Sequence, residues 1–174
     1  MLGEAQERWL YDSLRRSDAR YNVLASQTWI TPYRYNRAPD PAAINFDAWD
    51  GYGPARQRLL DVLASGVANP VAVTGDWHCA AASTLHQDPF DVRSKRVGVE
   101  FSGTSIASEC PWAGAMERSR ADNPHVRHYN GRKRGYCRFE VDDRHWNTGF
   151  RIVTDAADPQ SPVTTDVELR ARDL

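Results

Sequence analysis

The segment NPVAVTGDWH, residues 69–78, decides the fold of this chain. Its centre, PVAVT, is apolar and lacks polar alternation, which is typical of a strand buried on both faces in a parallel sheet. A β-rich run, YNVLASQTW, lies upstream at residues 21–29, and an apolar series at helical spacing separates the two runs. That series comprises Tyr52, Ala55, Leu59, Leu60 and Leu63, with Gly66 where the helix would end. We therefore predict a β-loop-α-β unit over residues 21–76, with residues 69–75 as a central strand flanked by residues 21–27 and an irregular loop over residues 31–50.

The remaining patterns predict an α/β fold with a β-hairpin near the carboxyl end. An opening helix is indicated by Leu2, Ala5, Trp9, Leu10 and Leu14. Residues 97–101 alternate as in a half-buried strand, whereas residues 102–124 are rich in Ser, Gly and Pro and are typical of a functional loop. Residues 136–141 and 146–152 alternate on either side of Asp142 and Asp143, which predicts a hairpin. A final edge strand is expected after Asp155.

Length and composition indicate one globular domain. The chain has 174 residues, of which 41% are hydrophobic and 26% are charged, so disorder and a membrane span are not expected. A net charge of -1 gives no support for nucleic acid binding. The amino-terminal residues are charged and lack the apolar core of a secretory signal. The three cysteines form no metal-binding spacing.

The predicted central strand ends in two potential metal ligands, Asp76 and His78. The carboxyl ends of parallel strands open onto the ligand crevice of α/β proteins. A carboxylate and an imidazole two residues apart can face the same ion, and Gly75 permits the turn that exposes them. The alternative is structural: Asp76 caps a turn and His78 is simply hydrogen bonded.

Two further clusters carry polar side chains. The segment NFDAWDGY contains Asn45, Asp47 and Asp50, although Asp47 or Asp50 in that position can equally be a helix cap. The segment DNPHVRHYNGRKRGY contains His125 and, in its basic turn, Arg134, which are candidates for contact with a substrate phosphate. Most basic turns, however, are merely solvated.

Six ordered motifs resemble the alkaline phosphatase D, or PhoD-like, family of metallophosphoesterases. They are LGxxQxxWL, SxARYxVLxxQ, NxDxWDGYxxxRxRLL, NPVxVTGDxH, EFxGTSI and NPHVxxYNGxxRGY, and together they cover almost the whole chain. The resemblance implies a calcineurin-like metallophosphoesterase sandwich, in which a sheet is flanked by helices and followed by the hairpin. It implies hydrolysis of phosphomonoesters and phosphodiesters, usually outside the cytoplasm, with calcium and iron as the metals.

Carried over by motif, Asp76 and His78 are the implied catalytic metal-site residues, and Asn45 and Asp50 lie on the loop beside them. Further metal-binding motifs of the family precede the part that residues 1–174 resemble, so the chain is similar to the carboxyl-terminal part of the domain. Trp77 also replaces a residue that is more often small or β-branched in the family. We therefore expect the chain by itself to be inactive, to bind metal weakly and to self-associate or need an amino-terminal half. The alternative is a non-catalytic α/β module.

Overall fold

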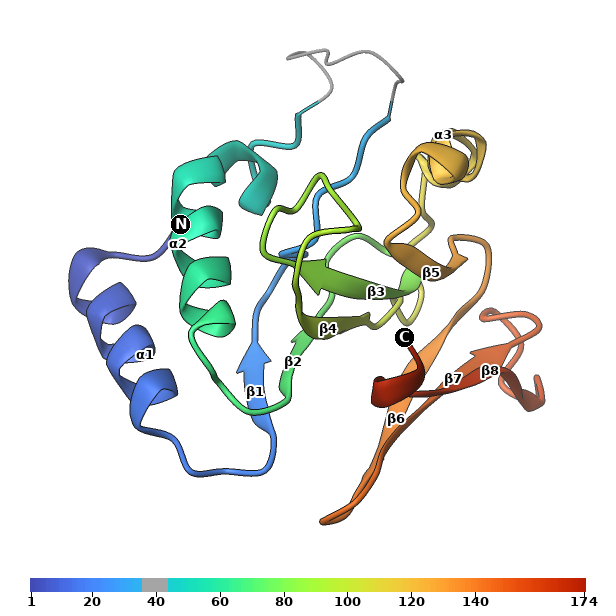
Figure 1. Ribbon diagram of the computed structural model, residues 1–174. Helices are drawn as coiled ribbons and strands as arrows, with labels where there is room; N and C mark the ends of the chain where they lie inside the picture. Colours follow the sequence, from blue (N-terminus) through green and yellow to red (C-terminus); the bar gives the residue numbers. More distant parts are fainter. Residues whose placement is uncertain (36–43) are drawn as a thin grey trace.

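The computed structural model describes residues 1–35 and 44–174 and contains two sheets (Figure 1). Part of the predicted loop over residues 31–50 lies outside the described residues. The helices are α1 (Glu4–Arg16), η2 (Trp49–Tyr52), α2 (Gly53–Ala64), α3 (Ala113–Ser119), η3 (Arg120–Asp122) and η4 (Ala171–Asp173). The strands are β1 (Asn22–Ala25), β2 (Pro70–Thr74), β3 (Ala80–His86), β4 (Arg96–Ser102), β5 (Val126–Asn130), β6 (Arg134–Val141), β7 (Trp146–Val153) and β8 (Val163–Arg170).

The predicted β-loop-α-β unit is confirmed. Strand β1 pairs in parallel with β2, and α2 lies between them in the chain. Proline in the first turn suits the start of α2, and Gly66, at a φ of 114°, follows its end. Strand β2 has a neighbour on each side in the order β1-β2-β4-β3-β5. Because side chains alternate across a strand, Val71 packs toward the second sheet and Ala72 toward the helices, with exposed fractions of 1% and 0%.

Strand β4 is more deeply buried than its sequence predicts. It pairs in parallel with β2 and antiparallel with β3, so it lies inside the sheet. The expected half-buried pattern is wrong, because Glu100 is as buried as its neighbours Val99 and Phe101. The Glu100 carboxylate accepts backbone hydrogen bonds from Ile30, at 2.9 Å, and Thr31, at 2.8 Å. These bonds offset the cost of burying a carboxyl group, and burial raises its pKa.

The predicted hairpin is confirmed as β6 and β7, and β8 adds an edge strand to form a three-stranded antiparallel sheet. Phe150 of this sheet and Phe101 of β4 belong to one buried cluster, so the two sheets pack face to face. Helices α1 and α2 cover the opposite face of the five-stranded sheet (Figure 1). The result is a layered α/β sandwich.

Two details of the helices differ from expectation. Helix α1 forms as predicted, but Trp9 is 65% exposed, because the face that packs against α2 carries Leu10, Tyr11 and Leu14 instead. The predicted loop over residues 102–124 contains α3 and η3. Within the described residues, no helix combines the length and the apolar character needed to cross a membrane.

Candidate metal centre

A strained three-residue turn follows β2. Asp76 and His78 both have positive φ angles, 70° and 53°, which are unfavourable for residues with a side chain. The Gly75 amide donates to the Gln27 carbonyl at 3.3 Å, and the Trp77 amide donates to the Gly75 carbonyl at 2.9 Å. Such conformations cost on the order of 1–3 kcal/mol each and persist where the surroundings impose them. Here they direct Asp76 and His78 away from the core.

Trp77 anchors this turn. It is 2% exposed, and its ring stacks on Trp29 with 4.6 Å between centroids and 6° between planes. The indole nitrogen of Trp77 donates to the Thr28 hydroxyl at 2.9 Å, and the Trp77 carbonyl accepts from the Trp112 indole at 3.2 Å. A large aromatic residue between Asp76 and His78 thus packs inward, whereas Asp76 is exposed and His78 is half-buried.

The hydrogen bonds of His78 leave one ring nitrogen available. Nδ1 of His78 lies 2.8 Å from the Glu109 carbonyl oxygen. A carbonyl can only accept, so Nδ1 is the donor and neutral His78 carries its proton there. Nε2 then presents a lone pair, and no hydrogen bond or ion pair to it is recorded among the described residues. A backbone carbonyl that fixes the tautomer in this way is the usual support for a metal-binding histidine.

Asp76 completes the pair. Its side chain is exposed, and within residues 1–35 and 44–174 its carboxylate makes no recorded hydrogen bond or ion pair. Two potential metal-ligand atoms, a carboxylate oxygen of Asp76 and Nε2 of His78, are therefore free of hydrogen bonds and ion pairs to the described residues, and they lie two residues apart in the sequence. Both donors suit a hard or borderline cation.

Arg134 supports the loop that orients His78. It is 8% exposed and donates to the Ser105 hydroxyl at 2.9 Å, to the Gly131 carbonyl at 2.8 Å and to the Ser108 carbonyl. These bonds hold the segment that carries Glu109. The Arg134 side chain, which the sequence indicates as a candidate for contact with a substrate phosphate, is thus hydrogen bonded to carbonyl and hydroxyl oxygens of its own chain.

His125 is committed to the fold in a similar way. It is 6% exposed, and its Nε2 donates to the Pro32 carbonyl at 2.8 Å. The neighbouring Asn123, fully buried, accepts from the Arg34 amide and donates to the Arg34 carbonyl, both at 2.8 Å. Together they clamp the chain that follows β1. Burial lowers the pKa of His125, which keeps its ring neutral.

The loop residues Asn45 and Asp50 have local partners. Asp50 accepts from the Tyr33 amide at 3.2 Å and pairs with Arg56, and the Asn45 side chain accepts from the Asp47 amide at 3.0 Å. The capping alternative is wrong, because Tyr52 occupies the N-cap of α2 without a side-chain cap bond. Within the part of the chain that the structure describes, no three His, Cys, Asp or Glu residues are grouped so as to hold a metal ion. Asp76 and His78 stand as a pair.

Sequence reasoning missed the residues that hold this pair in place. The Glu109 carbonyl and the Thr104 hydroxyl, which donates to the His78 carbonyl at 3.2 Å, both lie in the segment predicted as a functional loop. Its Ser- and Gly-rich composition was the available signal. The composition does not show which of its carbonyls faces a histidine.

The motifs and the fold are matched by known proteins. The family model described as PhoD-like phosphatase matches residues 1–150. The chain belongs to this family.

Alkaline phosphatase D of Bacillus subtilis (strain 168) is 36% identical over 171 residues, which cover 95% of this chain. A solved structure titled "Structure of PhoD" superposes with a TM-score of 0.82 at 32% identity and covers 96% of this chain. These matches confirm the family resemblance and the metallophosphoesterase-like fold. The chain spans 29% of the length of the Bacillus subtilis relative and 32% of the solved chain.

Proposed function

We propose that this chain contributes Asp76 and His78 to the metal centre of a phosphoric ester hydrolase of the alkaline phosphatase D type. Membership of a phosphatase family supports the reaction class. The observation that carries the assignment is the bond between His78 Nδ1 and the Glu109 carbonyl, because it reserves Nε2 for a ligand. The exposed carboxylate of Asp76 supplies the second donor.

Each residue has a definite task in this proposal. Asp76 and His78 bind the metal, and Trp77 fixes the orientation of the turn that carries them. Arg134 holds the segment whose Glu109 carbonyl sets the His78 tautomer. Asp50 keeps its loop in place through Arg56 and the Tyr33 amide, and Asn45, on the same loop, is the remaining candidate oxygen ligand. When bound, metal ions supply charge neutralisation for a phosphate ester and activation of a hydrolytic water.

Two ligands, Asp76 and His78, are too few for a centre that holds a cluster of metal ions. Clustered cations need several anionic ligands to offset their mutual repulsion. We propose that the remaining ligands come from an amino-terminal half of the enzyme, that calcium and iron are the metals, and that a phosphate ester is the substrate. We also propose that the chain is not catalytic by itself.

Histidine NMR tests the ligand assignment directly. In the metal-free chain, we expect long-range ¹⁵N spectra to show His78 protonated at Nδ1 and unprotonated at Nε2. Adding ferrous iron without oxygen should broaden the His78 signals first, and Asp76→Asn should weaken that effect. His145 provides the control, because it is a partly exposed histidine whose Nδ1 lies 3.5 Å from a carboxylate oxygen of Asp142. Equal broadening of His78 and His145, or a proton on His78 Nε2, would contradict the assignment.

Hydrolysis of an aryl phosphodiester tests the reaction class. With calcium and iron added, the chain alone should show no turnover above the metal blank. In a polypeptide extended by the amino-terminal half, turnover should appear, and Asp76→Asn should reduce kcat/KM by on the order of 100-fold or more with little loss of stability. Unchanged turnover in that variant would remove Asp76 from the site. Metal-dependent turnover by the chain alone, lost in His78→Ala, would show that no further half is needed.

A further inference from the structure

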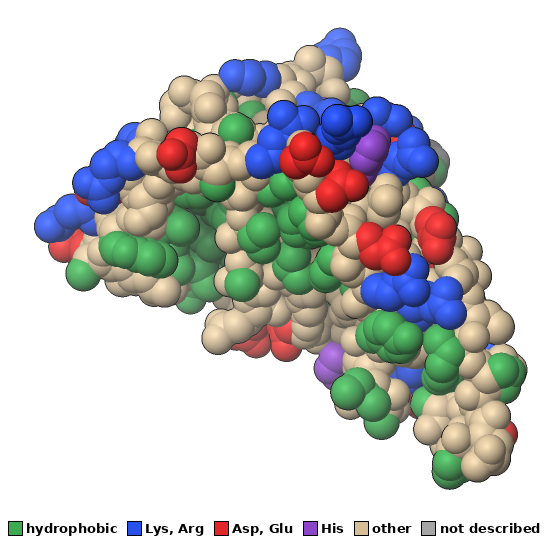
Figure 2. Space-filling view, turned by 90° about the horizontal axis from the view of Figure 1, so that it is seen from below, with side chains coloured by type: hydrophobic (Ala, Val, Ile, Leu, Met, Phe, Trp, Pro, Cys, Tyr) green, Lys and Arg blue, Asp and Glu red, His purple; other side chains and the backbone are tan. Residues whose placement is uncertain are grey.

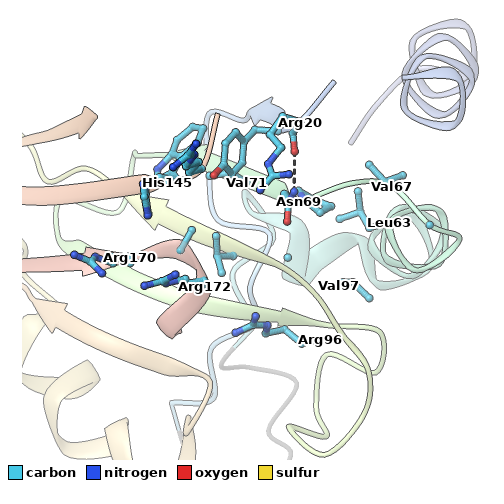
Figure 3. A pocket seen from close by; sticks show the side chains of 18 of the residues that line it. Arg20, Leu63, Val67, Asn69, Val71, Arg96, Val97, His145, Arg170 and Arg172 are labelled. Carbon is cyan, nitrogen blue, oxygen red and sulfur yellow. Dashed lines mark hydrogen bonds between the residues drawn. The ribbon is translucent and has the colours of Figure 1, made fainter. Parts of the chain in front are cut away.

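A second candidate site lies at the other end of β2. Strand β2 runs from Pro70 to Thr74, so Asp76 follows its carboxyl end. Pro70 and Val71 at its beginning line a cavity of about 490 Å³, together with Arg96 and Val97 at the beginning of β4. Figure 3 shows this cavity from close by. Its volume is in the usual range for small-molecule sites, about 300–1,000 Å³.

The lining of this cavity is strongly basic. Six Lys and Arg residues line it, namely Arg20, Lys95, Arg96, Arg144, Arg170 and Arg172, and His145 lines it as well. No described Asp or Glu residue is among the lining residues. This asymmetry is local, because the whole chain has a net charge of -1. Figure 2 shows the molecule from below, the side on which β1 begins, where Lys and Arg side chains gather beside hydrophobic ones, with Asp and Glu side chains interspersed among them.

Three of these six cations have no hydrogen-bond or ion-pair partner among the described residues. Arg144 and Arg172 lie 4.0 Å and 3.4 Å from the carboxylates of Asp143 and Asp173. The ammonium group of Lys95 donates to the Ala64 carbonyl at 2.7 Å. By contrast, the side chains of Arg20, Arg96 and Arg170 make no recorded hydrogen bond or ion pair within the described residues. They come from three separate parts of the chain: the connection before β1, the start of β4 and the end of β8. A concave surface that collects unpaired guanidinium groups raises the local concentration of anions.

The cavity rests on fixed backbone and a buried floor. Val71, Val97 and Trp146 are 1%, 5% and 6% exposed. The Asn69 side chain donates to the Arg20 carbonyl at 2.8 Å, a bond drawn in Figure 3, and so fixes the backbone that carries Arg20. In the same view Arg170 and Arg172 lie on one side of the cavity, across from Leu63 and Val67 of the helical side. The Arg20 backbone and the apolar floor of the cavity are therefore set by packed elements.

We propose that this cavity binds a compact anion that carries two or more phosphate groups. Guanidinium groups pair with phosphate oxygens through two parallel hydrogen bonds, which a planar fork favours. One exposed charge pair contributes little to binding, so a ligand must engage several cations at once to bind measurably. The inference uses neither Asp76 nor His78, and it goes beyond the proposed hydrolase function.

Titration calorimetry with inorganic tripolyphosphate tests the site. The metal-free 174-residue chain is titrated at constant ionic strength with tripolyphosphate, pyrophosphate and orthophosphate, and with oligoglutamate as a carboxylate polymer. Affinity should rise with the number of phosphates. The Arg96→Gln, Arg170→Gln double variant should bind tripolyphosphate at least about 10-fold more weakly, since each lost guanidinium removes a charge-assisted contact.

Matched variants make the result decisive. Arg15→Gln with Arg118→Gln changes the net charge equally but touches no cavity residue, and it should change the affinity by less than about 2-fold. His78→Ala should bind tripolyphosphate like the unaltered chain, which separates this site from the proposed metal centre. Equal losses in the two double variants, tighter binding of oligoglutamate, or no heat of binding at about 1 mM tripolyphosphate would each overturn the proposal.

Discussion

The segments Asp76-Trp77-His78 and Asn123-Pro124-His125 have similar composition and opposite orientation. In the first, the central Trp77 is 2% exposed, Asp76 is exposed and His78 is half-buried. In the second, Asn123 and His125 are 0% and 6% exposed and Pro124 faces solvent. His78 bonds through Nδ1 and leaves Nε2 available, whereas His125 uses Nε2 to hold Pro32. A polar residue and a histidine two positions apart can therefore be either a binding pair or a structural clamp, and the direction of the middle side chain decides which.

The anchor of the first segment should give the largest effect. Replacing Trp77 with Ala removes the stack on Trp29 and leaves a cavity, so we expect the free energy of unfolding to fall by about 3–5 kcal/mol. Trp9→Ala is the matched control, because the same substitution at a 65% exposed position should cost less than about 1 kcal/mol. Urea denaturation measures both. Similar losses would mean that Trp77 does not hold the turn.

The two histidines provide the direct test of the comparison. His125→Ala leaves the Pro32 carbonyl buried without its donor and should cost about 2–4 kcal/mol. His78→Ala loses one hydrogen bond near the surface and should cost about 1 kcal/mol or less. Paired urea titrations at pH 7.5 show the difference, and a larger loss at His78 would reverse the assignment of the two segments.

Much of the fold follows from local pattern, whereas the support of the site does not. Strand β2 and helix α2 are predictable because a short apolar run and a helical stripe are each visible in one stretch of sequence. Strand β3 is not, because its AAASTLH sequence has no alternation and its burial comes from β4 and β5 on either side. Asp76 and His78 are visible as residue types. The Glu109 carbonyl that orients His78 is a backbone group, and any residue would supply it.

Backbone strain at Asp76 predicts a gain in stability when the candidate ligand is removed. Glycine adopts a φ of 70° at little cost, so Asp76→Gly should raise the free energy of unfolding by up to about 1 kcal/mol while abolishing the proposed oxygen ligand. Asp12→Gly, within helix α1, should instead lower it by roughly 1 kcal/mol. A stability loss at Asp76 as large as that at Asp12 would show that its side chain is needed for folding.

The smallest effect is a pH dependence that belongs to the clamp. Burial lowers the pKa of His125, so between that pKa and about 6.5 the unfolded chain binds a proton that the folded chain does not. Stability contributed by neutral His125 is therefore complete above about pH 6.5 and is lost as the pH falls, with a slope of at most about 1.4 kcal/mol per pH unit.

Glu100 acts in the opposite sense, because burial raises its pKa and the folded chain is the first to take up its proton. The difference between the unaltered chain and His125→Gln cancels Glu100, and the glutamine amide can still donate to the Pro32 carbonyl. Urea midpoints at pH 5.5, 6.5 and 7.5 should converge between the two proteins as the pH falls, and parallel midpoints would mean that His125 is not held neutral by the fold.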